Sequence, residues 1–293
     1  MSAPTPPITT NNDHGGSRPS AFRRFSTLST RLPGGNIPDT FRNNFIATLG
    51  EFVGTFLFLF FSFAGTQISN EPPPTPGAKP NHIALLYSSL AFGVSLAVNV
   101  WVFYRVTGGL FNPSVTLALF LIGSLSPIRA VLVFAAQIVA GIAAAGVVSC
   151  LFPGPLVVYT RLGSGTSITQ GLFIEMFLTA QLVITIIMLA AVKHKATYLA
   201  PLGIGLAFFL TELCGDPFTG GSLNPARSLG PDVINRQFPG YHWIYWVGPG
   251  LGSLLAVGMF YILKALHYQT CNAHQDDDHE KLVETAAPPG GHA

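Results

Sequence analysis

The chain has little charge. Asp, Glu, Lys and Arg make up 10% of its 293 residues, against roughly 25% in soluble domains. Hydrophobic residues make up 49%, and the mean hydropathy is +0.46. The formal net charge is +2 and no basic stretch with interleaved aromatic residues occurs, so the sequence predicts no nucleic-acid partner. Composition alone indicates a membrane protein.

Cysteine and metal-ligand patterns are also sparse. Cys150, Cys214 and Cys271 are scattered and form no Cys-x-x-Cys pair, which argues against a disulfide framework or a metal site. The eight histidines show no His-Glu-x-x-His or similar spacing. We therefore expect no metal, no cofactor, no catalytic residue and no enzymatic activity. The polar N-terminal region has no apolar run that resembles a cleaved signal.

What the sequence does contain is long apolar runs. A run of about 20 apolar residues is long enough to span a bilayer as a helix. Such runs occur at residues 43–68, 82–104, 127–152, 169–192, 199–214 and 241–267. The fifth is short by this criterion. The sequence predicts an all-α membrane protein with six transmembrane helices.

The polar and charged residues outside these runs predict the organisation of the chain. Lys and Arg gather near both termini and after the second and fourth spans, which places both termini in the cytoplasm. We expect disordered tails at residues 1–42 and 268–293. They flank a membrane domain at 43–267, made of two repeats at about 43–152 and 169–267, and the plasma membrane is the expected location.

Two Asn-Pro tripeptides interrupt the apolar sequence. Asn is a good N-cap and Pro suits the first turn of a helix, so each tripeptide predicts the start of a short helix at membrane depth. Such broken backbone is tolerated in a bilayer where it is buried in protein or lines a watery cavity. Each tripeptide follows a Gly-Gly pair, and the two are Asn112-Pro113-Ser114 and Asn224-Pro225-Ala226.

The two halves of the chain repeat these features. Glu51 and Thr55 in the first span correspond to Glu175 and Thr179 in the fourth, and each half has one Asn-Pro turn. Three spans per half place the halves in opposite orientations. The two short helices then meet with their N-termini near the midplane. Their dipoles and the Asn side chains would pass a neutral dipolar molecule and repel cations.

These motifs resemble those of a known family. Residues 107–116 (Thr-Gly-Gly-Leu-Phe-Asn-Pro-Ser-Val-Thr) and 219–231 (Thr-Gly-Gly-Ser-Leu-Asn-Pro-Ala-Arg-Ser-Leu-Gly-Pro) are similar to the two signatures of the aquaporin, or major intrinsic protein, family. Over about residues 43–267 the chain most resembles the orthodox water channels of fungi. The resemblance implies two half-helices in an inverted repeat and a homotetramer with one pore per subunit. It also implies passive water flow, driven by osmotic gradients, that excludes protons and ions.

The resemblance further implies roles for single residues. A selectivity filter is expected on the extracellular side. Glu51 and Glu175 are expected to hold the loops before the half-helices by hydrogen bonds. The filter positions match Phe92, Glu212, Gly221 and Arg227.

Glu212 departs from the family pattern, which often has His at this position. A charge at the bilayer centre costs roughly 2.5–3.5 kcal/mol on insertion scales, so a carboxylate there needs a partner or a water-lined face. Two interpretations stay open. Glu212 lines the filter beside Arg227, or it lies hydrated at the outer end of its helix.

The identity of the solute is also open. Ser228, where glycerol-conducting relatives usually have Asp, and the pair Tyr245-Trp246 favour water. Glu212 in place of His, together with Gly221, works the other way by widening the filter. Hydrogen peroxide is the alternative solute, and glycerol is less favoured. More distant alternatives are a proton-coupled transporter that uses the membrane-embedded glutamates and a junctional scaffold.

One candidate modification site lies in the N-terminal tail. Arg23-Arg24-Phe25-Ser26 places a hydroxyl two residues after a basic pair, a pattern like basic-directed kinase sites. A phosphate on Ser26 would compete with Arg or lipid contacts. The alternative is a basic anchor at the membrane surface with an unmodified Ser26.

Overall fold

The computed structural model describes residues 38–71, 81–163 and 165–272. The chain divides into two units, Met1–Asp39 and Thr40–Ala293, and the helices described below belong almost entirely to the second. Ser26 and most of the two predicted tails lie outside the described residues.

Six helices of the described chain are long and apolar enough to cross a membrane. They are α2 (Asp39–Ser69), α3 (His82–Phe103), α5 (Pro127–Leu151), α6 (Ile168–Ile186), α7 (Ala200–Thr219) and α9 (Ile244–Ala265). Short turns extend three of them: a π-helical turn η1 (Ile187–Ala191) after α6, η2 (Lys195–Leu199) before α7 and η3 (Tyr268–Thr270) after α9. The predicted all-α class and its six spans are confirmed.

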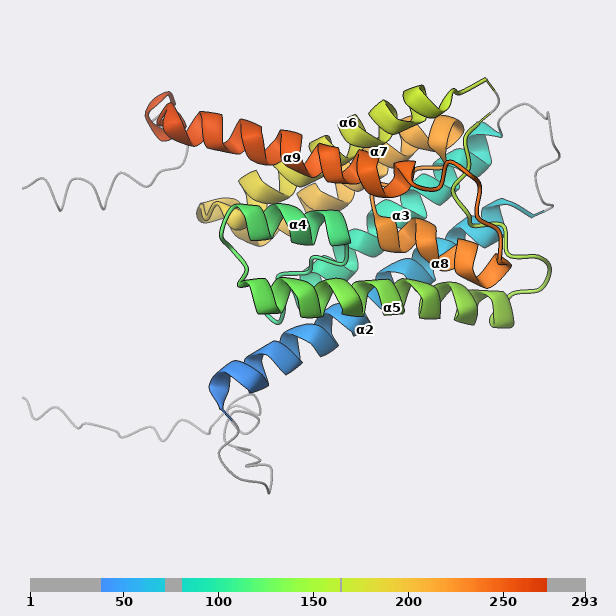
Figure 1. Ribbon diagram of the computed structural model, residues 1–293, viewed down its shortest axis with the longest axis horizontal. Helices are drawn as coiled ribbons and strands as arrows, with labels where there is room; N and C mark the ends of the chain where they lie inside the picture. Colours follow the sequence, from blue (N-terminus) through green and yellow to red (C-terminus); the bar gives the residue numbers. More distant parts are fainter. Residues whose placement is uncertain (1–37, 72–80, 164, 273–293) are drawn as a thin grey trace, which may run out of the picture. The chain divides into compact units, whose positions relative to one another are not determined.

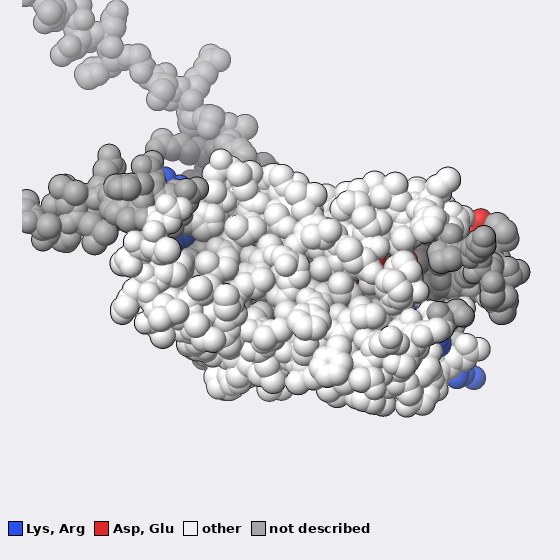
Figure 2. Space-filling model, turned by 90° about the horizontal axis from the view of Figure 1, so that it is seen from above, with Lys and Arg blue, Asp and Glu red and all other residues white. Residues whose placement is uncertain are grey.

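Apolar side chains cover the outside of these helices as well as the inside. Phe58 on α2 and Phe92 on α3 are fully buried. Phe61 on α2, Leu90 on α3 and Leu254 on α9 are half exposed. A helix that is apolar all round is typical of a membrane span. The face shown in Figure 2 carries hardly any charged atoms along its middle, and those visible lie toward its two ends.

Two short helices complete the fold. They are α4 (Pro113–Leu121) and α8 (Pro225–Asn235). Each begins at the Pro of its tripeptide, and the preceding Asn caps it. The Asn112 side-chain oxygen accepts from Ser114 N, and the Asn224 oxygen accepts from Ala226 N and Arg227 N. The starts of both half-helices therefore lie where the N-cap and Pro pattern predicts.

The helices pair across the two halves of the chain. α3 packs against α7, the helix in the same position of the other half. Each half-helix packs on the last helix of the opposite half: α4 on α9, and α8 on α5. Figure 1 also shows the start of α2 and the end of α9 at the same end of this unit. The pairing has the symmetry of an inverted repeat.

The fifth span is longer than the sequence predicted. The apolar run ends at residue 214, but α7 continues through Asp216 and Pro217 to Thr219. Proline ends most helices within a turn, and here the end comes at Gly220, whose left-handed φ of 80° lets its N–H reach Asp216 O at 2.9 Å. The extension brings α7 directly to the Gly-Gly pair that precedes α8.

Candidate functional site

The two Asn side chains join the half-helices to each other. Asn112 Nδ2 donates to Leu223 O at 2.8 Å, and Asn224 Nδ2 donates to Phe111 O at 2.9 Å. The acceptor in each case is the residue just before the opposite Asn. Each amide carries a second N–H, which has no protein partner among the described residues. It is free to donate to a molecule beside the two Asn residues.

Left-handed backbone makes these carbonyls reachable. Phe111 and Leu223 have φ values of 51° and 52°, although neither is glycine. Such a conformation is uncommon for residues with a Cβ and is often found at functional sites. Gly108 and Gly220 begin the two turns at φ values of 97° and 80°. The same backbone path therefore recurs in both halves.

Buried carboxylates hold the two turns. Glu51 accepts from Leu110 N at 3.1 Å and from Phe111 N at 2.9 Å. Its Oε2 also accepts from Gln137 Nε2 at 2.8 Å. The side chain is fully buried, so the three hydrogen bonds offset the cost of removing the carboxylate from water.

Glu175 repeats this arrangement in the second half. It accepts from Ser222 N at 2.9 Å and from Leu223 N at 2.8 Å, and it is also fully buried. Both glutamates thus make the hydrogen bonds that loop support requires.

A narrow cavity lies beside the paired Asn residues. The volume of this cavity that is accessible to a water-sized sphere is about 10 Å³. This is roughly the volume that one water needs. Its polar contributors are Asn112 and Asn224. Its other walls are mostly apolar and come from both halves: Phe58, Leu96, Gly109, Leu110, Val115, Leu182, Ile186, Ile204 and Phe208.

Arg227 lies in the first turn of α8 and is 2% exposed. Its Nη1 donates to Val158 O at 2.7 Å and its Nη2 to Gly220 O at 3.1 Å. Its Cζ lies 4.9 Å from the ring centroid of Phe92, a cation–π distance. Phe92 stacks in turn on Phe208, with centroids 5.8 Å apart. Two backbone carbonyls and an aromatic ring therefore hold the guanidinium.

Glu212 lies close to Gly221, another of the predicted filter positions. A Cβ on Gly221 would collide with the Glu212 carboxylate, and Gly221 has a φ of 56°. Glu212 is 1% exposed and lies within α7, so it is not a hydrated helix end. No ion pair within 4.0 Å joins Glu212 to Arg227 in the described chain. Glu212 Oε1 and Arg227 Nε are both without a hydrogen-bond partner among these residues.

A second charged cluster lies around α8, and no sequence pattern indicated it. Asp232 on α8 forms an ion pair with Arg161 at 2.6 Å, and its Oδ2 lies within hydrogen-bond distance of His242 Nδ1 at 2.7 Å. Its carboxylate is fully buried. Asp232 is an acidic residue within a short helix at membrane depth, which signals a partner, but its sequence neighbours do not say which one.

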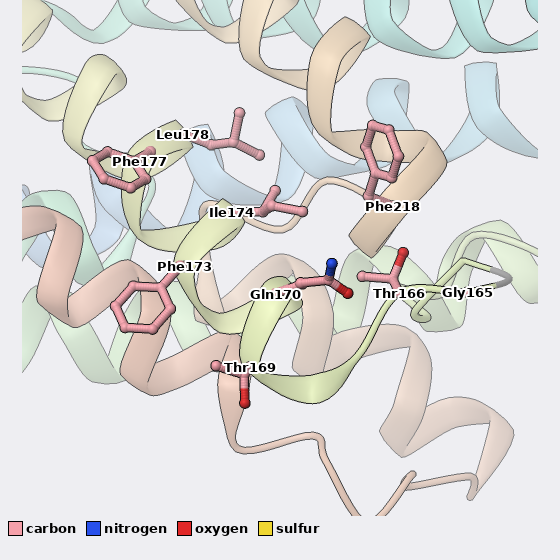
Figure 3. A pocket seen from close by; sticks show the side chains of 9 residues that line it. All are labelled: Gly165, Thr166, Thr169, Gln170, Phe173, Ile174, Phe177, Leu178 and Phe218. Carbon is pink, nitrogen blue, oxygen red and sulfur yellow. The ribbon is translucent and has the colours of Figure 1, made fainter.

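A larger hollow, of about 690 Å³, lies on the outer face along α6 and α7. Figure 3 shows Phe173, Phe177 and Phe218 around it, with Thr169 and Gln170 toward one end. None of the predicted filter or Asn-Pro residues lines this hollow. It is an open, apolar part of the outer surface, separate from the Asn pair.

Comparison with known proteins extends these observations. A family model described as "Major intrinsic protein" matches residues 40–261. The chain is 58% identical over 240 residues to "Aquaporin-7" of Botryotinia fuckeliana (strain B05.10), covering 80% of this chain and 53% of that protein. It is 52% identical over 242 residues to "Aquaporin-1" of Gibberella zeae (strain ATCC MYA-4620 / CBS 123657 / FGSC 9075 / NRRL 31084 / PH-1), covering 82% and 76%. The chain thus spans about half the length of the first of these relatives.

A solved structure shares the fold. The aquaglyceroporin from Plasmodium falciparum aligns with a TM-score of 0.63 and 20% identity, over 74% of this chain and 95% of that chain. This likeness concerns the fold alone. The family model goes further, because it spans residues 40–261, from the start of α2 into α9, and the fungal relatives match about 80% of the chain. The chain belongs to the major intrinsic protein family, whose members are multi-pass membrane channels rather than enzymes.

Proposed function

We propose that the protein is a passive channel for water. The observation that carries the proposal is the narrow cavity beside Asn112 and Asn224, which has room for roughly one water. Two amide N–H groups can orient a molecule there, while the apolar walls offer it few other partners. A water whose oxygen accepts from both amide N–H groups has no lone pair left for a neighbouring water. It therefore breaks the chain of water-to-water hydrogen bonds, which opposes proton transfer through the channel.

The half-helix dipoles support exclusion of ions. α4 and α8 both begin at the Asn pair, so the positive ends of two helix dipoles point at the same place. Arg227 adds a fixed charge nearby, held by Val158 O and Gly220 O. A cation would have to shed its water against this potential, whereas a neutral molecule would not.

Stopped-flow swelling of proteoliposomes tests the proposal. The wild type should raise osmotic permeability above that of empty liposomes without dissipating a proton gradient reported by a pH dye. Ile204→Phe, which fills the cavity wall, should lose most of this permeability. Ile128→Phe is the matched control, because Ile128 lies on the outside of α5 and is 66% exposed. Permeability equal to empty liposomes in several lipids and at several pH values would contradict the proposal. Accumulation of solute coupled to the proton gradient would instead favour a transporter.

Hydrogen peroxide is the second candidate solute. The observation that favours it is the pair of unpartnered groups, Glu212 Oε1 and Arg227 Nε, at the proposed filter. Hydrogen peroxide has both donors and acceptors, so it can hydrogen-bond to both groups. Glu212→His should lower peroxide flux relative to water flux in the same preparation. A peroxide-to-water ratio in Glu212→His equal to that of the wild type, measured from pH 4 to 8, would mean that Glu212 does not contact the passing solute.

We also propose a homotetramer in the plasma membrane with both termini in the cytoplasm. The Lys and Arg near both termini support the orientation of the termini, and the exposed apolar side chains on the outer helix faces support a place in a membrane. The hollow along α6 and α7 (Figure 3) offers an apolar surface that a neighbouring subunit or lipid would cover. Native mass spectrometry from detergent measures the assembly state. A predominantly monomeric spectrum at several detergent concentrations would contradict the tetramer.

A further inference from the structure

The segment between α5 and α6 is held in place by side chains of other elements. From Pro155 to Gly163 it contains no helix or strand. Gln67 Nε2 and Asn70 Nδ2, at the end of α2, donate to Pro155 O at 2.9 Å and Val157 O at 3.0 Å. Backbone that lacks the regular hydrogen bonds of a helix or sheet keeps its position through such contacts.

The charged anchor of this segment is Asp232 on α8. Arg161 Nη1 lies 2.6 Å from Asp232 Oδ1, and His242 Nδ1 lies 2.7 Å from Oδ2. The carboxylate is fully buried, whereas the Arg161 side chain is 24% exposed. A buried carboxylate is stable only when it is paired, so Asp232 confines Arg161 to one position.

His242 is itself fixed. Trp246 Nε1 donates to His242 Nε2 at 3.2 Å. Because an indole N–H is only a donor, Nε2 is the acceptor in this contact, and Nδ1–H is left to donate to Asp232. Arg161 is fixed as well, since it also donates to Thr160 O at 2.6 Å and to Gln237 O at 3.0 Å.

The carbonyl that holds Arg227 lies in the same anchored segment. Val158 O accepts from Arg227 Nη1 at 2.7 Å and lies three residues before Arg161. Between them, Thr160 Oγ1 donates to the hydroxyl of Ser228, the residue after Arg227, at 2.9 Å. The positions of Val158 O and of the guanidinium are thus coupled to the Arg161 anchor.

We propose that Asp232 is a positioning residue for the filter. By holding Arg161 it fixes the segment 155–163, and through Val158 O it fixes the Arg227 side chain. The inference rests on the proposed place of Arg227 in the filter. It adds a determinant of selectivity that contacts neither the solute nor the Asn pair.

The test compares water and urea permeability in proteoliposomes of the full chain. Asp232→Asn and Arg161→Ala should each raise the urea-to-water ratio about 3- to 10-fold, the range expected when one hydrogen bond that orients Arg227 is lost. Arg161→Lys keeps the charge near Asp232 and should stay close to the wild type. Arg129→Ala is the matched control: Arg129 is also partly buried and bonds Asn44, but it is not part of the Asp232 cluster.

A double variant separates positioning from general loosening. Because the effect passes through Arg227, Arg227→Ala with Asp232→Asn should give the same ratio as Arg227→Ala alone, whereas independent effects would multiply. Elution profile and thermal unfolding identify the folded variants. If Asp232→Asn does not fold, Arg161→Ala, whose side chain is partly exposed, decides the question.

Two outcomes would overturn the inference in different ways. A wild-type ratio in folded Arg161→Ala, alongside a raised ratio in Arg227→Ala, would show that the Asp232 anchor has no part in selectivity. A wild-type ratio in Arg227→Ala itself would remove Arg227 from the filter, and both the proposed filter and this inference would be wrong.

Discussion

Asn112 and Asn224 each use both the oxygen and the nitrogen of the side-chain amide. The oxygen caps the residue's own half-helix, and one N–H bonds a carbonyl of the opposite half. The second N–H has no protein partner among the described residues. Only the side-chain amides of Asn and Gln combine an acceptor oxygen with two N–H donors in one group, so the chemistry of the site depends on amide groups at these two positions.

Asn224→Asp tests this dependence. The carboxylate keeps the capping acceptor but loses the donor to Phe111 O, and two oxygens then face each other. We expect the free energy of unfolding to fall by about 1–3 kcal/mol, the cost of leaving a buried polar group unsatisfied, and water flux to fall with it. Thermal unfolding and stopped-flow swelling measure the two effects. Asn44→Asp is the control, since Asn44 serves Arg129 as an acceptor. Equal effects at both positions would contradict the argument.

Gly221 and Glu212 form a second single-residue test. Gly221→Ala adds a Cβ that collides with the Glu212 carboxylate and puts an L side chain at a φ of 56°. The left-handed backbone alone costs about 1–2 kcal/mol, and the collision adds to it. Combining Gly221→Ala with Glu212→Ala should remove the collision and recover part of the loss in thermal stability. Gly240→Ala, with open space around it, should be close to neutral. No recovery in the double variant would show that the two residues do not contact each other.

At the scale of helices, the sequence predicted those helix ends that depend on a few adjacent residues. The starts of α4 and α8 followed from Asn and Pro, because a cap and a fixed φ act on the adjacent turn. The end of α7 did not, because Asp216 and Pro217 break the apolar run without breaking the helix. The π-helical turn η1 after α6 had no signal that we recognised.

The contacts between distant residues show where sequence reasoning stops. The sequence left Glu212 either lining the filter beside Arg227 or hydrated at a helix end. The structure buries it against Gly221, with no ion pair to Arg227 within 4.0 Å. Arg161 and Asp232 are 71 positions apart, and nothing in either local sequence names the other. A buried carboxylate in a half-helix indicates that a partner exists, but tertiary packing decides which one.

The two loop-supporting glutamates belong to this scale, because each one orders a whole turn before a half-helix. Glu51→Gln and Glu175→Gln each replace one acceptor oxygen by an NH₂ that faces a backbone N–H. Each should lower the free energy of unfolding by about 1–3 kcal/mol, and by similar amounts, since the pairs of backbone bonds match. Thermal unfolding in one detergent measures both. A large loss in one half and none in the other would show that the repeats are not equivalent in stability.

At the scale of the whole molecule, the cavity is separated from the cysteines. Cys150, Cys214 and Cys271 are exposed, and none lines the cavity beside the Asn pair. A small thiol reagent that modifies all three should therefore leave water flux unchanged.

Ile204→Cys supplies the positive control for this prediction. Ile204 lines the cavity, so the same reagent should block that variant. Mass spectrometry confirms modification and stopped-flow swelling measures the block. Full block of the wild type by the reagent would mean that the path of water runs elsewhere.

The reciprocal Asn bonds have a consequence for how such a chain is synthesised and how it could have arisen. The first half is made before the second exists, so Asn112 has no carbonyl to bond until α8 enters the membrane. A protein consisting of one half alone would meet the same need only by inserting in both directions and pairing with an oppositely oriented copy about a two-fold axis. Duplication of such a gene, with an odd number of spans, would fix the two directions in one chain. Since each Asn bonds a carbonyl of the opposite half, the junction could have worked as a symmetric dimer before the two halves were joined.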